Sequence, residues 1–105
     1  MKIRHLLILS GSLFFAANAC AEDGAALFKK NNCVACHQVA SKTVGPSLKA
    51  IAAKYAGDAT AQAKLETKVR KGGKGNWGSM EMMPVAASVS DADISAMVAY
   101  VLATK

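Results

Sequence analysis

The chain has 105 residues, enough for one small domain, and only 6% of them are aromatic. A domain of this size buries a low fraction of its surface and usually needs a staple, such as a disulfide, a metal or a bound cofactor. The formal net charge is +6 at pH 7. No recognition motif or interleaved aromatic residue accompanies the basic side chains, so the sequence does not support nucleic-acid binding.

The N-terminus has the pattern of a secretory signal peptide. A short basic segment, residues 1–5, precedes an apolar run, residues 6–17, that is too short to span a bilayer. Ala19-Cys20-Ala21 then supplies the small-x-small pattern that signal peptidase recognises. We therefore predict cleavage before Glu22.

Removal of residues 1–21 would leave one domain over residues 22–105, exported to the periplasm and without stable membrane insertion. Cleavage before Cys20 is the alternative, because it would leave a lipidated N-terminus. The residues ahead of Cys20 are Ala17-Asn18-Ala19, a poor lipobox, so this alternative is disfavoured.

A first helix is expected from a cap at Asp23 to about Asn31, with Leu27 and Phe28 facing the core. The chain then reaches Cys33-Val34-Ala35-Cys36-His37. This C-x-x-C-H spacing is the attachment signal for a c-type haem. Two thiols at this separation can add to the two vinyl groups of one porphyrin, and His37 then lies under the iron as its proximal ligand.

A C-x-x-C pair also occurs in structural zinc sites and in dithiol redox sites. A zinc site needs four ligands, and Cys33, Cys36 and His37 supply three. A thioredoxin-like dithiol needs a surrounding βαβ pattern, and the sequence shows no strand-like alternation. Covalent haem attachment is therefore the favoured interpretation. The haem would be the staple of the domain, and we expect the chain without it to be largely unfolded.

The remaining sequence predicts three more helices and so an all-α fold. The expected helices run from Leu48 to Ala56 with a cap at Ser47, from Asp58 or Thr60 to about Lys71, and onward from a cap at Ser90. The last helix carries an apolar stripe that includes Met97, so Met97 is expected in the core. The stretch between the third and fourth helices is expected to be irregular.

Two further features bear on the haem. A ligating imidazole normally donates its second N–H to a nearby acceptor, and the backbone carbonyl of Gly45 or Pro46 is our candidate. The alternative is that Gly45-Pro46 is only a turn that leads into the next helix. His37 is also the only histidine beyond the signal peptide, so the ligand opposite it is expected to be a methionine sulfur. Met80, Met82 and Met83 are the candidates, and spacing alone does not choose among them.

Cys33 to His37, Val44-Gly45-Pro46, Trp77-Gly78 and Met82-x-Pro84 together make the chain resemble a small bacterial single-haem class I cytochrome c of the c-551/c-552 group. The resemblance implies four short helices wrapped around one covalently attached haem c. It also implies that the axial methionine lies five residues after the Trp of the Trp-Gly pair, at Met82.

The resemblance further implies that the Trp77 indole N–H bonds a haem propionate and that Lys68 is a basic partner of the propionates. It implies an aromatic pair, Phe28 and Tyr100, where the first and last helices cross. One departure concerns the methionine itself. The group's usual Pro-Met-Pro-Pro-Asn is here Glu81-Met82-Met83-Pro84-Val85, which makes Met83 a competitor for the iron.

The function that follows is electron transfer rather than catalysis. A filled axial pair leaves no open iron position for a substrate, whereas a haem peroxidase or gas sensor needs one. We expect a monomeric periplasmic carrier of a respiratory chain that docks transiently on acidic redox proteins through its lysines. A nitrite reductase or a terminal oxidase is the kind of partner expected.

Overall fold

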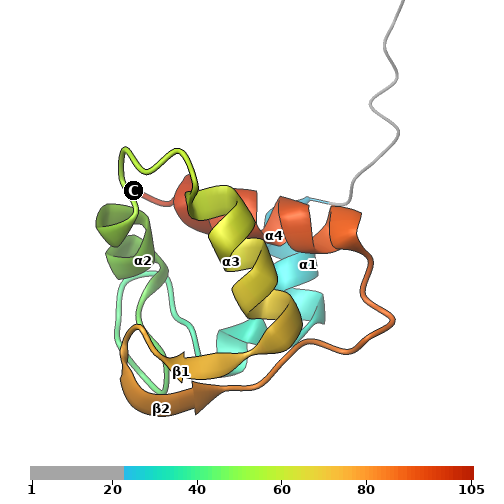
Figure 1. Cartoon of the computed structure of the whole chain (residues 1–105), viewed down its shortest axis with the longest axis horizontal. Coiled ribbons are helices and arrows are strands. Elements are labelled where there is room, and N and C mark those ends of the chain that lie inside the picture. Colours follow the sequence, from blue (N-terminus) through green and yellow to red (C-terminus); the bar gives the residue numbers. More distant parts are fainter. Residues whose placement is uncertain (1–22) are drawn as a thin grey trace, which may run out of the picture.

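The computed structural model describes residues 23–105; the predicted signal peptide and both candidate cleavage sites, before Glu22 and before Cys20, lie outside the described residues. Four α-helices and one small sheet make up the described part (Figure 1). The elements in chain order are α1 Gly24–Lys30, the 3₁₀ turn η1 Cys33–Ala35, α2 Leu48–Lys54, α3 Ala61–Lys71, β1 Gly73–Gly75, β2 Gly78–Met82 and α4 Asp91–Leu102.

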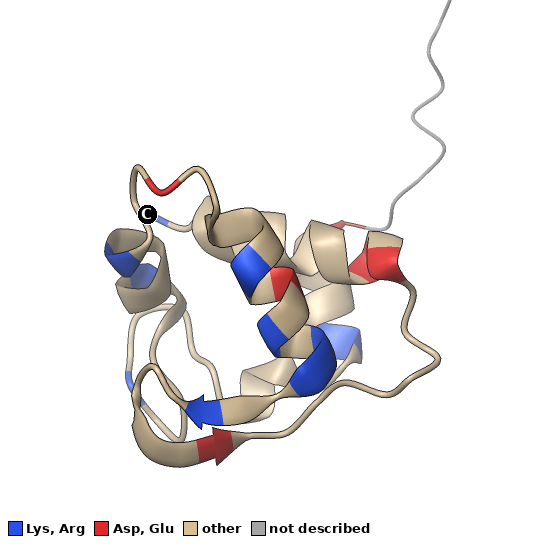
Figure 2. Cartoon of the chain, in the orientation of Figure 1, with Lys and Arg blue, Asp and Glu red and all other residues tan. Residues whose placement is uncertain are grey.

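Side-chain caps begin three of the helices where the sequence predicted them. The Asp23 carboxylate accepts a hydrogen bond from the N–H of Ala25 at the start of α1. The Ser47 hydroxyl accepts a hydrogen bond from the N–H of the third residue of α2, and the Ser90 hydroxyl does the same in α4. Both distances are 3.1 Å. Each cap satisfies an N–H that has no partner inside its helix. The acidic first turn of α4, red in Figure 2, also suits the positive end of the helix dipole.

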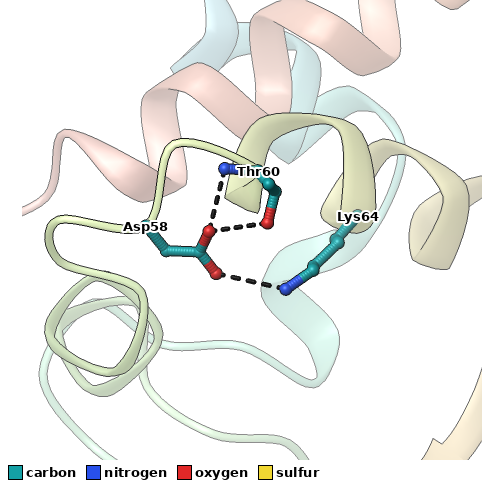
Figure 3. Close-up of polar contacts among 3 residues, drawn as sticks. All are labelled: Asp58, Thr60 and Lys64. Carbon is teal, nitrogen blue, oxygen red and sulfur yellow. Dashed lines mark hydrogen bonds and ion pairs between the residues drawn. The ribbon is translucent and has the colours of Figure 1, made fainter.

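α3 starts from a different arrangement, because Thr60 precedes it without a side-chain cap. Asp58 binds this turn instead: one carboxylate oxygen accepts from the Thr60 N–H at 2.8 Å and from the Thr60 hydroxyl at 2.6 Å (Figure 3). The other oxygen lies 3.3 Å from the Lys64 ammonium group. The bonds from Thr60, and then Lys64, lower the pKa of Asp58. This carboxylate is therefore ionised at neutral pH, and its contribution to stability is lost only in acid.

α4 is the helix around which the others pack, and it contacts α1, α2 and α3. The sequence predicted an apolar stripe of Ile94, Met97, Val98, Val101 and Leu102; the first four are buried and Leu102 is partly buried. Met97 is 2% exposed, which confirms it as a core residue. The α1–α4 crossing contains the expected aromatic pair, with the Phe28 and Tyr100 rings 5.7 Å apart and edge to face.

The stretch after α3 is not irregular, as the sequence suggested, but forms a hairpin. β1 and β2 pair antiparallel, with Gly73 opposite Met82 and Gly75 opposite Gly78, so Asn76 and Trp77 form its turn. The mostly helical fold that the sequence predicted is confirmed, with this small two-stranded sheet added to it. Ser79-Met80-Glu81-Met82 alternates polar and apolar residues, which is a strand signal, but the run is short and lies among glycines.

No helix within residues 23–105 is long and apolar enough to cross a membrane.

Candidate functional site

A cavity of about 540 Å³ opens between α1, α2, α3, the hairpin and the loop that joins α1 to α2. Its volume lies within the roughly 300–1,000 Å³ of typical cofactor cavities. Much of the wall is aliphatic and comes from all of the helices except α1, namely from Leu48, Ile51, Leu65, Val69, Val98 and Val101. A large apolar ligand therefore fits this space.

Cys33, Cys36 and His37 all line this cavity. Asn32 turns the chain out of α1 with a φ of 60°, a left-handed conformation that asparagine tolerates. The 3₁₀ turn Cys33–Ala35 follows, and the N–H of His37 donates to the carbonyl of Cys33 at 2.9 Å. This tight turn is the reason that two thiols and an imidazole occupy one wall.

The His37 ring is held by the chain that follows it. Nδ1 lies 2.8 Å from the carbonyl oxygen of Pro46, one of the two acceptors that the sequence suggested. A carbonyl can only accept a hydrogen bond, so Nδ1 carries the proton and Nε2 keeps a free lone pair. This is the tautomer that a metal-binding imidazole requires.

Gly45 lies against the same ring. A Cβ atom at this position would come within 2.6 Å of His37 Cε1 and 2.9 Å of Nδ1. Such distances are too short for atoms that are not bonded, so only glycine fits here without moving the imidazole. Sequence reasoning treated Gly45 as a candidate acceptor and missed this steric role.

We predict that Gly45→Ala tilts the His37 ring and destabilises the haem-loaded protein by about 1–3 kcal/mol, the usual cost of overpacking. Thermal unfolding and the haem absorption spectrum measure the two effects. Gly57→Asn is the matched control, because Gly57 has open space around it and a φ of +76° that asparagine adopts. An unchanged spectrum and melting temperature in Gly45→Ala would contradict this assignment.

The Cys33 thiol does not have the properties of a reactive cysteine in a dithiol redox centre. Burial, and then the neighbouring Cys36, raises the pKa of the Cys33 thiol. A reactive C-x-x-C cysteine has a lowered pKa. Residues 23–105 also contain no group of three or more His, Cys, Asp or Glu side chains that could hold a metal ion.

The three candidate methionines all line the cavity from β2 and the residue after it. They differ in exposure. Met80 is 65% exposed and Met83 is 76% exposed, whereas Met82 is partly buried at the end of β2, where it pairs with Gly73. Met82 is therefore the one whose main chain the hairpin holds and whose side chain the protein partly covers.

Trp77, in the hairpin turn, lies beside a lysine that sequence reasoning did not connect with it. The ammonium group of Lys54, the last residue of α2, lies 4.4 Å from the centre of the Trp77 ring. The same group donates to the carbonyl of Asn76 at 2.8 Å. A cation over an indole face is an attractive contact, so Lys54 stabilises the packing of the hairpin turn against α2. Nothing in the local sequence indicates this contact between distant residues.

The cavity has a positive lining. Among the residues that the structure describes, the Lys, Arg, Asp and Glu side chains that line it are Lys42, Lys68, Lys74 and Glu81. The three lysines belong to the loop that leads to α2, to α3 and to β1, and each of these segments carries blue in Figure 2. Such a lining suits a ligand that is apolar in the body and carries carboxylates at one edge.

These features fit a porphyrin. Two thiols, an imidazole with a free Nε2 and a thioether line one apolar cavity, and basic side chains also line it. Comparison with known proteins identifies the class. The family model for cytochrome c matches residues 11–105.

The chain belongs to the cytochrome c family.

Two curated relatives are similar over almost the whole chain. Cytochrome c-552 of Nitrosomonas europaea is 48% identical over 105 residues, 100% of both chains. Cytochrome c-551 of Pseudomonas aeruginosa is 42% identical over 95% of this chain and 94% of the relative. The crystal structure of wild-type Nitrosomonas europaea cytochrome c552 superposes with a TM-score of 0.70 and 51% identity, over 77% of this chain and 99% of that one.

The predicted resemblance to the c-551/c-552 group is thus confirmed, and so is the class I cytochrome c fold, with the two-stranded sheet added. As a cytochrome c, the protein carries one covalently attached haem c and is an electron carrier rather than an enzyme.

Proposed function

We propose that the chain is a periplasmic electron carrier in which His37 and Met82 are the two axial ligands of the haem iron. The hydrogen bond from His37 Nδ1 to the Pro46 carbonyl is the observation that carries the proposal. It leaves Nε2 as the ligating atom, and the carbonyl raises the basicity of the ring. We propose Pro46 as part of the cofactor site for this reason.

Covalent attachment is proposed at Cys33 and Cys36, through thioethers to the two vinyl groups. The haem supplies one-electron chemistry between Fe(III) and Fe(II) when bound. The chain's own contribution is to hold that group in one place. Partial burial of Cys33, the 3₁₀ turn and the fixed imidazole all limit movement on this wall.

On the opposite ligand, partial burial and strand pairing favour Met82 over its neighbours. A thioether ligand raises the reduction potential relative to a second histidine. It also fills the iron's last position, so an exogenous ligand must displace it.

Trp77 and Lys68 are proposed to bind the haem propionates. Both line the cavity, and the Lys54 ammonium group over the Trp77 ring restricts the orientation of the indole. An indole N–H and an ammonium group are donors only, so each suits a carboxylate.

The partners are proposed to be acidic redox proteins of a periplasmic respiratory chain, such as a nitrite reductase or a terminal oxidase, that bind a monomer transiently. Lys42, Lys68 and Lys74 around the cavity support this charge preference. Export is proposed through the signal peptide at residues 1–21, which leaves a domain over residues 22–105. The relatives' names do not specify a partner for this chain.

Carbon monoxide tests the filled axial position. We expect the reduced native protein at neutral pH to show no change in its absorption spectrum under carbon monoxide, because a thioether already occupies the iron. Met82→Ala is the matched positive control, since it opens that position and should bind the gas readily. Ready binding by the native protein would instead indicate a vacant iron, as in a haem peroxidase or a gas sensor.

A further inference from the structure

The segment from Met82 to Ser90 joins β2 to α4 and is here called the methionine segment. Residues 69–72, the end of α3 and the glycine that follows it, lie against this segment at three points. The N–H of Val85 donates to the carbonyl of Val69 at 3.1 Å. Arg70 donates to the carbonyl of Val89 at 2.7 Å.

The third point of contact is Gly72. A Cβ atom here would meet the Met82 carbonyl oxygen at 2.5 Å and the Pro84 nitrogen at 2.9 Å, and its φ is +68°. The chain just after α3 therefore lies so close to the methionine segment that a side chain would not fit between them. Contacts at the start, middle and end of the segment all come from residues 69–72.

Arg70 makes the contact that a side chain alone can remove. Its Nη2 atom lies 2.7 Å from both the Val89 carbonyl oxygen and the Asp91 carboxylate. The Asp91 side chain is 98% exposed, and an ion pair in water contributes little. Both bonds are charge-assisted, but the bond to Val89 is partly buried, so solvent and salt screen it less than the exposed pair with Asp91.

The methionine segment has few internal contacts to hold it. Within residues 83–89 of the described chain, the backbone hydrogen bonds are Val85 to Val69 and Val89 to Ala86. Pro84 is the one proline of the segment, so proline restricts the backbone conformation of the segment at few positions. Support from outside the segment is therefore needed to keep Met82 in place.

We propose that Arg70 is a positioning residue for the Met82 thioether and acts through the Val89 carbonyl. This inference rests on the proposed ligation by Met82. With the far end of the methionine segment held to α3, the sulfur competes well against other ligands. Without Arg70, the methionine segment moves away from α3 more often, and an added ligand then binds the iron more easily.

Imidazole titration of the oxidised haem-loaded protein tests the proposal. We expect Arg70→Leu to bind imidazole about tenfold more tightly than wild type, which corresponds to about 1.4 kcal/mol. Arg70→Gln is the milder variant, with a smaller shift in the same direction. Lys71→Leu removes a positive charge from the same turn at an exposed position, and should bind imidazole as wild type does. Asp91→Asn keeps the bond to Val89 and should also behave as wild type.

Amide hydrogen exchange separates positioning from general stability. We expect the Val85 amide to exchange about tenfold faster in Arg70→Leu while the amide of buried Val98 keeps its wild-type rate. Unchanged imidazole affinity, or equal acceleration at Val85 and Val98, would overturn the role of Arg70. Met82→Ala gives the separate check: if it retains the iron–sulfur absorption band, the ligation by Met82 is wrong, whatever Arg70 does.

Discussion

Replacement of both Cys33 and Cys36 by alanine is expected to leave the chain largely unfolded. The haem would then have no covalent attachment, and the cavity of about 540 Å³ would have no permanent occupant. The aliphatic side chains that line the cavity would then face water, and each costs about 1.5–3 kcal/mol when it is left exposed. The loss of a few such contacts is comparable with the whole stability of a domain, about 5–15 kcal/mol.

Far-UV circular dichroism during heating of the purified double variant measures this effect. We expect low helical signal at 25 °C and no cooperative transition. Cys36→Ala alone is the matched control, since it keeps one thioether and His37 and should remain a folded haem protein. A cooperative, native-like melt of the double variant would show that the helices are stable without the cofactor.

Met82→Ala is expected to abolish the iron–sulfur charge-transfer band of the oxidised protein and to lower the reduction potential. A drop on the order of 100 mV is expected, because the choice of axial ligand moves haem potentials across about 0.8 V. The physical basis is that Met82 is partly covered and held in the hairpin, whereas Met83 is 76% exposed.

Met83→Ala is the matched control, and Met80→Ala is a second one from the same strand as Met82. Both should keep the band and a potential near that of wild type. Loss of the band in Met83→Ala, with its retention in Met82→Ala, would reassign the ligand to Met83. Visible absorption spectra and a spectroelectrochemical titration give both quantities.

The helices could be predicted from the sequence because their signals are local. Asp23, Ser47 and Ser90 cap the helices that they were expected to cap, and each bond reaches only two or three residues along the chain. The stripe on α4 is likewise a periodic pattern within one element. Both kinds of signal can be identified without knowing what the helices pack against.

The hairpin was missed because its strands do not carry the usual signal. β1 is Gly-Lys-Gly, and β2 is mostly exposed along its length, so neither strand presents a continuous apolar face. What stabilises the hairpin comes from elsewhere in the fold, including the Lys54 contact with Asn76 and Trp77. Local patterns contain no information about such partners.

The contacts of the haem site likewise include local ones, which a sequence can indicate, and long-range ones, which it cannot. The attachment motif occupies five consecutive positions and could be identified from spacing, whereas the Pro46 carbonyl, nine residues from His37, was suggested mainly by the family resemblance. The contact of Arg70 with Val89 spans 19 positions and that of Lys54 with Asn76 spans 22. Both depend on how α2 and α3 pack, which a single sequence does not specify.

Because α1 and α4 pack on each other, the core joins the two ends of the domain. The contact between the Asn31 amide and the Met97 sulfur spans 66 positions. The entropic cost of closing a loop rises only slowly with its length, so burial of the residues that α1 and α4 share can offset it. Without α4, Leu27 and Phe28 of α1 would lose the apolar surface on which they pack. The helix that leads directly to Cys33 and Cys36 therefore depends on the far end of the domain for its place in the fold.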